Sequence, residues 1–261
     1  MEYRNLAINF IKRGNKKLEY YDGALIGADK NLHQQVFKVV TEICKSKNIK
    51  KEDIKILDIA CGNGAFSKKM YDNGYIVECC DVTDAGFKFK DKFKFTKIDI
   101  NSDEFINFCE TNEENYDIII SMETIEHLEN PWRFMKGLKK LCKKERYIIL
   151  TTPNIESPWS KCSFVVSNKF FQFSEGNLSY WHINPLTEFE ILLIGKNLRL
   201  TCEEVMGGGE YPIIWLPENI IEFDLHKITW TLLHLFAFPF CKKVNLSWCK
   251  IYVLKKQNDN L

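Results

Sequence analysis

The sequence lacks the features that would place it at once among secreted, membrane or nucleic-acid-binding proteins. Its ten cysteines include no C-x-x-C pair and no regular spacing, a usage typical of a reducing compartment. Lysine and arginine number 36 against 35 acidic residues, so no excess of positive charge indicates a polyanionic partner. The chain has no signal-peptide core and no apolar run near the roughly 20 residues of a membrane-spanning helix. These absences predict a soluble, cytoplasmic protein.

What is present suffices for a globular protein, since 45% of the 261 residues are hydrophobic. Strand-like and helix-like segments alternate over residues 52–205, which predicts an α/β fold with a parallel sheet. Residues 1–51 predict an N-terminal helical cap, and residues 52–261 predict the main domain. Within that domain, residues 155–186 predict a lid and residues 206–247 predict an apolar insertion.

The most informative segment is Lys55–Gly64, a buried strand followed by a glycine turn and helix-compatible residues. A turn of this kind between a parallel strand and a helix places backbone N–H groups at the carboxyl edge of a sheet. Gly62 and Gly64 have no Cβ atom, so a ligand can approach the backbone closely there. The segment therefore predicts a ligand site.

The residues around the glycines indicate which ligand fits. A dinucleotide site prefers Gly or Ala where Ser67 stands, and no phosphate-binding G-x-x-x-x-G-K motif occurs. The pattern is instead acid-x-small-x-Gly-x-Gly, with Asp58 and Ala60 ahead of the glycines and Cys61 between. An acid suits a cationic ligand without phosphate, such as S-adenosylmethionine, whose carboxylate can use the amides of the helix N-terminus.

On these residues the chain resembles the class I S-adenosylmethionine-dependent methyltransferases. The resemblance implies a Rossmann-like, doubly wound sheet of seven strands, mostly parallel with an antiparallel last strand, plus N-terminal helices and two insertions. Asp81 ends the second strand, about twenty residues after the glycines, and is expected to bind the ribose hydroxyls. The family pattern also implies that Asp99 meets the adenine amino group and that Met122 flanks the adenine ring.

A group of residues with reactive side chains follows the fourth strand. In a helical turn, Glu123, Glu126 and His127 would stand at i, i+3 and i+4, on one face. Together with the distant His182 they predict a site for a divalent cation such as Mg²⁺, Mn²⁺ or Zn²⁺. This arrangement resembles two metal-using branches of the family, the ubiquinone-biosynthesis enzymes and the 2′-O-methyltransferases of small-RNA 3′ ends.

An alternative without metal stays open. Many metal-independent members of the family carry a Glu-His pair at this place. In that case His127 or His182 is the predicted general base, because a neutral imidazole near pH 7 can accept a hydroxyl proton.

Residues 228–241 are apolar almost all round yet too short to span a bilayer. Two interpretations are open for this segment. It is either buried, against the sheet or in an interface of a homo-oligomer, or it contacts a membrane surface with the help of nearby lysines. The second interpretation predicts a peripheral protein at the inner face of a membrane.

The sequence therefore predicts an enzyme that methylates a hydroxyl of a small molecule, a quinone precursor, or a glycan or lipid-linked sugar. One alternative is an RNA 2′-O-methyltransferase of the small-RNA type, which the balanced charge and lack of a basic stripe disfavour. Another alternative is a non-catalytic binding protein with a methyltransferase fold. The sequence does not name the acceptor.

Overall fold

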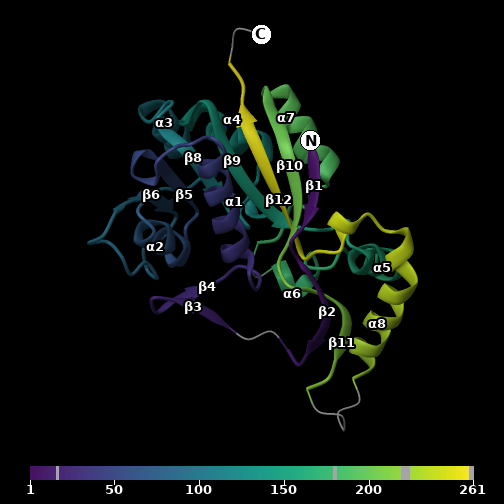
Figure 1. Cartoon of the computed structure of the whole chain (residues 1–261). Helices are drawn as coiled ribbons and strands as arrows, with labels where there is room; N and C mark the ends of the chain where they lie inside the picture. Colours follow the sequence, from purple (N-terminus) through teal and green to yellow (C-terminus); the bar gives the residue numbers. More distant parts are fainter. Residues whose placement is uncertain (16–17, 179–180, 219–223, 259–261) are drawn as a thin grey trace.

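The computed structural model describes residues 1–15, 18–178, 181–218 and 224–258 (Figure 1). Residues 179–180 of the expected lid and 219–223 of the expected insertion lie outside the described residues. The strands are β1 (Glu2–Asn5), β2 (Ile8–Arg13), β3 (Glu19–Tyr21), β4 (Ala24–Ile26), β5 (Lys55–Ile59), β6 (Ile76–Asp81), β7 (Lys94–Lys97), β8 (Tyr116–Ser121), β9 (Cys142–Pro153), β10 (Leu200–Gly208), β11 (Tyr211–Leu216) and β12 (Cys249–Lys256). The α-helices are α1 (Leu32–Ser46), α2 (Ala65–Asp72), α3 (Asp103–Thr111), α4 (Pro131–Leu141), α5 (Pro158–Ser167), α6 (Glu175–Leu178), α7 (Glu188–Asn197) and α8 (Leu225–Ala237). Short 3-10 turns are η1 (Lys51–Asp53), η2 (Ile125–His127), η3 (Phe238–Phe240) and η4 (Lys243–Asn245).

The main sheet has eight strands in the order β1-β10-β12-β9-β8-β5-β6-β7. All neighbours are parallel except β12, which is antiparallel to both β10 and β9. Alternate residues of the central strands point to opposite faces. Ile56 and Ile118 pack with α1 and α2 on one face, whereas Leu57 and Ile119 pack with α3, α4 and α7 on the other. The predicted doubly wound α/β fold with an antiparallel last strand is confirmed.

The prediction of a helical cap over residues 1–51 is wrong for its first half, where four strands precede the single long helix α1. Asp22 and Gly23 both have positive φ angles, 45° and 73°, and close a hairpin between β3 and β4. β1 pairs in parallel with β10, which adds an eighth strand to the seven that the family pattern implied. β2 pairs with β11 of the expected insertion. These pairings are long-range, so the N-terminal segment is part of the main domain.

The expected insertion supplies β11 and α8, which surround a small second core of aromatic side chains. Trp230 and His234 of α8 are fully buried there. On the opposite side of α8, Leu232 is 63% exposed and Phe236 is 77% exposed. The apolar segment is therefore buried on one face only. No helix among the described residues is long and apolar enough to cross a bilayer.

Candidate active site

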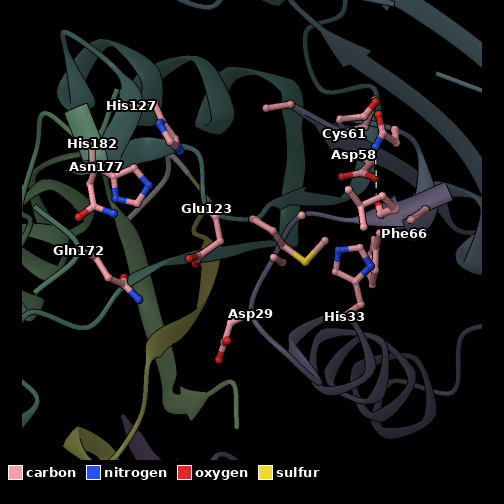
Figure 2. Close-up of a pocket in the computed structure, with 18 residues that line it drawn as sticks. Asp29, His33, Asp58, Cys61, Phe66, Glu123, His127, Gln172, Asn177 and His182 are labelled. Atoms are coloured by element: carbon pink, nitrogen blue, oxygen red, sulfur yellow. Dashed lines mark hydrogen bonds between the residues drawn. The ribbon is translucent and has the colours of Figure 1, made fainter. Parts of the chain in front are cut away.

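A pocket of about 620 Å³ lies at the carboxyl ends of β5 and β8. Figure 2 shows Asp58, Cys61, Phe66 and His33 at one end of it. At the other end lie the residues His127, His182, Asn177 and Gln172, with Glu123 between the two ends. We call the first the cofactor end and the second the acceptor end.

The turn after β5 has a left-handed backbone at three positions, with φ angles of 59° at Ala60, 54° at Gly62 and 79° at Gly64. A Cβ atom on Gly62 would meet no described atom within 4 Å, and Gly62 lines the pocket. A Cβ atom on Gly64 would lie 2.6 Å from the ring of Phe87. Gly62 thus leaves room for a ligand, whereas Gly64 leaves room for the protein's own core.

Asp58 lines the cofactor end and is only 2% exposed. Its Oδ2 accepts a hydrogen bond from Ser67 Oγ at 2.5 Å. Burial raises the pKa of this carboxyl to about 7, although the Ser67 hydrogen bond opposes the rise. A carboxyl poised in this way can hold a cation in the pocket when it is ionised.

Asp81 accepts two backbone hydrogen bonds, from Gly62 N at 2.8 Å and from Thr83 N at 3.2 Å. Asp99 is exposed and accepts one from Asn101 N at 2.9 Å. Among the described residues that line the pocket, neither Asp81 nor Asp99 is found, and Gly64 is also absent from the lining. The predicted cofactor-binding residues that do line it are Asp58, Ala60, Cys61, Gly62 and Met122. The ribose and adenine roles of the two acids stay predictions.

Glu123 follows β8 with a positive φ of 48° and lines the middle of the pocket. Its N–H donates to Thr151 Oγ1 at 3.0 Å, and the same hydroxyl donates to Glu123 Oε1 at 2.9 Å. The Cys249 thiol donates a hydrogen bond to Glu123 Oε2, with a distance of 3.3 Å between Sγ and Oε2. Neighbouring strands β9 and β12 therefore hold this carboxylate in place.

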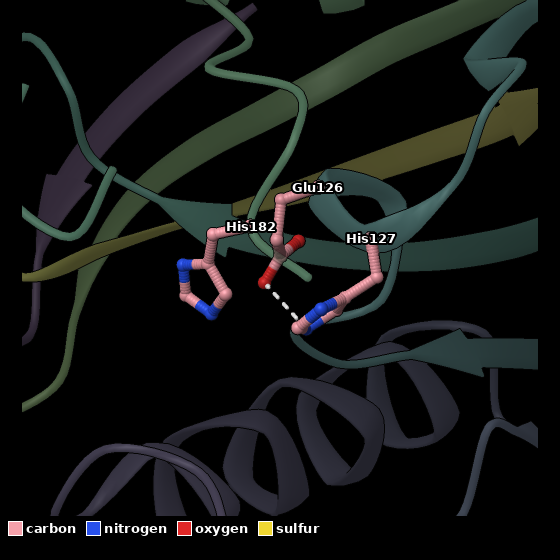
Figure 3. A group of neighbouring side chains, drawn as sticks. All are labelled: Glu126, His127 and His182. Carbon is pink, nitrogen blue, oxygen red and sulfur yellow. Dashed lines mark ion pairs between the residues drawn. The ribbon is translucent and has the colours of Figure 1, made fainter. Parts of the chain in front are cut away.

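Three residues of the predicted metal-binding group come together at the acceptor end (Figure 3). Glu126, His127 and His182 offer one ligand atom each, all within 4.8 Å of one another. Glu126 Oε1 lies 3.7 Å from His127 Nε2. The imidazole rings of His127 and His182 pack edge to face, with 4.8 Å between their centroids. The fourth predicted ligand, Glu123, is not in this group of described residues, because residues 125–127 form a 3-10 turn rather than the α-helical turn that the spacing predicted.

Hydrogen bonds to the backbone of Glu126 bring His182 to this place. The Glu126 carbonyl accepts from Ile183 N and from Asn184 N, both at 3.0 Å. These bonds fasten the end of the expected lid to the turn that carries His127. Burial, and next the nearby His127, lower the pKa of His182, so its imidazole is neutral near pH 7.

Glu126 itself is fully buried, and its Oε2 accepts from Thr152 Oγ1 at 3.1 Å. No described residue donates a hydrogen bond to its Oε1. Burial raises the pKa of this carboxyl well above its usual range, and the charge of Glu123 adds to the rise. A buried carboxyl oxygen that accepts no hydrogen bond from a described residue, together with two imidazoles, is a donor set that fits a divalent cation.

Several residues that line the pocket are not predicted by any pattern in the sequence, among them Asp29, His33, Gln172 and Asn177. Burial lowers the pKa of His33 to about 4, and no described residue pairs with its Nδ1. Asp29 accepts from Glu210 N at 3.2 Å. Asp29 lies just before α1 and His33 lies in its first turn, whereas Gln172 and Asn177 lie between α5 and α7, and no motif in the sequence marks them.

The chain is similar to known methyltransferases. Residues 28–188 match a family model described as "Methyltransferase domain". The ubiquinone biosynthesis O-methyltransferase of Pasteurella multocida (strain Pm70) is 32% identical over 183 residues, which are 64% of this chain and 74% of that protein. That of Glaesserella parasuis serovar 5 is 32% identical over 107 residues, which are 38% of this chain and 45% of that protein. The chain thus spans less than half the length of the first curated relatives that it matches.

Solved structures share the fold at low identity. A SAM-dependent methyltransferase from Archaeoglobus fulgidus superposes with a TM-score of 0.56 at 16% identity, over 84% of this chain and 94% of that chain. Magnesium protoporphyrin IX methyltransferase from Synechocystis PCC 6803, solved with bound SAH, gives 0.51 at 14% identity, over 86% and 83%. The family match covers more than half of the chain and includes the turn after β5 and the pocket histidines His33, His127 and His182. The chain therefore belongs to the class I S-adenosylmethionine-dependent methyltransferase family.

Proposed function

We propose that this protein transfers a methyl group from S-adenosylmethionine to a hydroxyl of a small molecule. The observation that carries the proposal is a single pocket with the glycine turn at one end and two histidines at the other. A methyltransferase must place a cofactor and an acceptor in one such pocket, with the acceptor oxygen in line with the methyl carbon.

Each predicted residue of the cofactor end has a role in this proposal. Asp58, once ionised, balances the positive charge of the cofactor, and Gly62 lets it lie against the backbone with Ala60 and Cys61. Asp81 binds the ribose hydroxyls, and Asp99 and Met122 contact the adenine. Gly64 keeps the turn packed on Phe87.

The reaction is one displacement at the methyl carbon. The acceptor oxygen forms a bond to that carbon while the carbon–sulfur bond breaks, and the electron pair of the broken bond stays on sulfur. S-adenosylhomocysteine leaves as a neutral thioether. The hydroxyl proton passes to His127 or His182, since neutral imidazole is a base of suitable strength.

Glu126, His127 and His182 would also hold a divalent cation, Mg²⁺, Mn²⁺ or Zn²⁺. Such a cation lowers the pKa of a bound hydroxyl. The chain's own part is to keep the donors ready: Thr152 fixes the Glu126 carboxyl, and Ile183 and Asn184 fix the backbone beside His182.

The relatives named above support a phenolic quinone precursor as acceptor, and a sugar hydroxyl is a further candidate. The test uses S-adenosylmethionine labelled in the methyl group, offered with 3,4-dihydroxybenzoate, with UDP-glucose, or with a short RNA bearing a 3′-terminal ribose. We expect label in a small-molecule product. Label in the RNA alone would revive the small-RNA hypothesis. Tight S-adenosylmethionine binding without transfer to any of a broad panel of acceptors would favour a binding protein.

The exposed face of α8 supports a peripheral contact with a membrane. Its large apolar side chains are exposed to solvent, and so are Lys242 and Lys243, which follow η3 after Cys241. Apolar residues next to lysines are the composition of an interfacial helix. The exposed apolar residues are Leu225, Ile228, Leu232, Leu235, Phe236 and Phe240. The same face would serve as an interface if the protein forms a homo-oligomer.

A further inference from the structure

A second cavity of about 600 Å³ lies between α5 and α8 and shares Gln172 and Asn177 with the acceptor end of the pocket. Figure 1 shows the two helices next to each other, outside the main sheet. One face of α5 lines the cavity, with residues at helical spacing: Trp159, Cys162, Ser163, Val166 and Ser167. Because two residues line both spaces, a molecule that reaches His182 can extend into this cavity.

The cavity has an aromatic lining and few groups to offer a polar ligand. Trp159, Phe170 and Phe171 supply the rings. The hydroxyls that line it donate their protons within the chain. The pairs are Ser163 to Lys169 O at 2.8 Å, Ser167 to Ser163 O at 2.7 Å, Ser174 to Asn177 Oδ1 at 2.8 Å and Thr229 to Leu225 O at 2.9 Å.

The charge in the lining is also neutralised, because Lys169 Nζ donates to Glu175 Oε1 at 2.7 Å. A sugar or phosphate group gains affinity from protons that the site donates to it, and here the four hydroxyls and Lys169 already donate within the chain. Of the other polar side chains in the described lining, Gln172 and Asn177 lie where the cavity meets the pocket, which leaves His226 beside the aromatic rings. An apolar group needs no such partners and gains from leaving water. The lining chemistry therefore favours an apolar occupant.

We propose that this cavity binds an alkyl or aryl substituent of the methyl acceptor, whose hydroxylated head lies beside His127 and His182. The inference rests on the proposed function and narrows it to an amphiphilic acceptor, in preference to a free sugar. Val166 lines the cavity and is 80% exposed, so the cavity opens to the surface there. A substituent longer than the cavity can leave through this opening.

The first test is a fluorescence titration of the full chain with N-phenyl-1-naphthylamine, an uncharged apolar dye. We expect saturable binding of one dye per chain. Val166→Trp and Thr229→Trp fill the cavity from opposite walls and should each weaken binding at least about tenfold. Val165→Trp is the matched control, because Val165 is the neighbouring residue, 82% exposed and not among the described lining residues.

Melting temperatures and S-adenosylmethionine affinity check that the variants fold. No dye binding, or equal binding by wild type and both filled variants, overturns the proposal. Loss of dye binding in Leu232→Ser/Phe236→Ser would also overturn it, since the dye would then sit on the outer face of α8. Because these readouts need no methyl transfer, they stand apart from the fate of the proposed function.

The second test links the cavity to the acceptor. We expect a KM for 4-hexylcatechol at least about tenfold below that for catechol, since burial of alkyl carbons is favourable. Val166→Trp should raise the KM for 4-hexylcatechol but not the KM for catechol, and it should leave kcat unchanged. Equal KM values for the two catechols overturn the acceptor role. If neither catechol is methylated, the phenolic acceptor of the proposed function is wrong, and the dye titration still decides what the cavity binds.

Discussion

The cofactor end and the acceptor end of the pocket are constructed from different parts of the protein. At the cofactor end, the turn after β5 exposes its backbone to the pocket, and the positive φ angles of Ala60 and Gly62 set the shape of this turn. At the acceptor end, side chains from segments far apart in sequence meet, as His127 and His182 do. The first end depends on backbone conformation. The second depends on a few hydrogen bonds that tie the expected lid to η2.

The largest expected effect is at the acceptor end. We predict that His127→Ala lowers kcat by about 10²–10⁴-fold, the usual contribution of a general base, and that His182→Ala lowers it comparably if both share the proton or a cation. Affinity for S-adenosylmethionine should change less than about twofold, because neither side chain belongs to the turn after β5. Turnover assays and calorimetry measure the two effects. Normal kcat in both variants would remove the histidines from the reaction.

Removal of metal distinguishes the two mechanisms proposed for the acceptor end, one with a bound cation and one with a histidine base alone. If Glu126, His127 and His182 hold a cation, excess EDTA should abolish turnover, and Mg²⁺, Mn²⁺ or Zn²⁺ should restore it. Glu126→Gln keeps the shape of the side chain but weakens it as a ligand, so it should imitate EDTA. Full activity in EDTA would leave the histidines as bases without metal.

At the cofactor end the largest effect is on stability. We predict that Gly64→Ala lowers the free energy of unfolding by about 2–4 kcal/mol, since the Cβ meets Phe87 and the left-handed angle strains a side chain. The Phe87 ring cannot yield easily, because it packs on Phe89, Phe93 and Phe95. Denaturant titration measures the loss.

Gly62→Ala is the matched variant, because its Cβ has open space and only the angle is strained. It should cost about 1–2 kcal/mol of stability. Its main effect should be weaker S-adenosylmethionine binding, since the added methyl group projects into the ligand's space. Equal effects of the two substitutions on stability and on binding would contradict the different roles given to the two glycines.

Asp81 tests whether the acid at the end of β6 serves the cofactor. We predict that Asp81→Ala weakens S-adenosylmethionine binding by about 1–3 kcal/mol, because the ribose hydroxyls lose their partner. Calorimetry on the folded variant measures the change. Asp99→Ala is the comparison at the adenine position. Unchanged affinity in Asp81→Ala would leave Asp81 only as the acceptor for Gly62 N and Thr83 N.

The fold and the glycine turn of the cofactor end could be predicted because their signals are local. Asp58, Ala60 and Gly62 stand within five positions, and the period of the strands identifies the sheet. The N-terminal strands could not be predicted, because β1 and β2 are stabilised by pairing with β10 and β11, some 200 residues away.

The acceptor end was predictable only in part. The sequence shows Glu126 and His127 as neighbours after β8 and predicts His182 as their distant partner. The exclusion of Glu123 from their group depends on the 3-10 turn and on Thr151 and Cys249, which are distant in sequence. Gln172 and Asn177 reach the pocket through the packing of the expected lid, for which the sequence has no periodic signal.

A smaller effect concerns pH at the cofactor end. The folded-state pKa of Asp58 is raised to about 7, so the free protein holds a proton there below pH 7 and loses stability from this group as pH rises from about 4 to 7. A cationic cofactor prefers the ionised carboxylate. We predict that the affinity for this cofactor rises about tenfold from pH 6 to pH 8, because the ionised fraction of a carboxyl with a pKa of about 7 rises about tenfold over that range. Asp58→Asn should flatten this dependence in calorimetric titrations, and a flat profile in the wild type would contradict the role of Asp58.

The smallest expected effect on stability is at the outer face of α8. Leu232→Ser/Phe236→Ser should change the free energy of unfolding by no more than about 0.5 kcal/mol per residue, because both side chains are exposed. It should nevertheless abolish flotation with vesicles of anionic lipid, to which Lys242 and Lys243 are attracted. Trp230 is fully buried, so flotation is a better measurement than tryptophan emission. Ile106→Ser on α3, also an exposed apolar residue, is the control and should float normally. A wild-type protein that stays at the bottom of the gradient, and that sediments as a dimer which the double substitution dissociates, would have a subunit interface on this face and no membrane contact there.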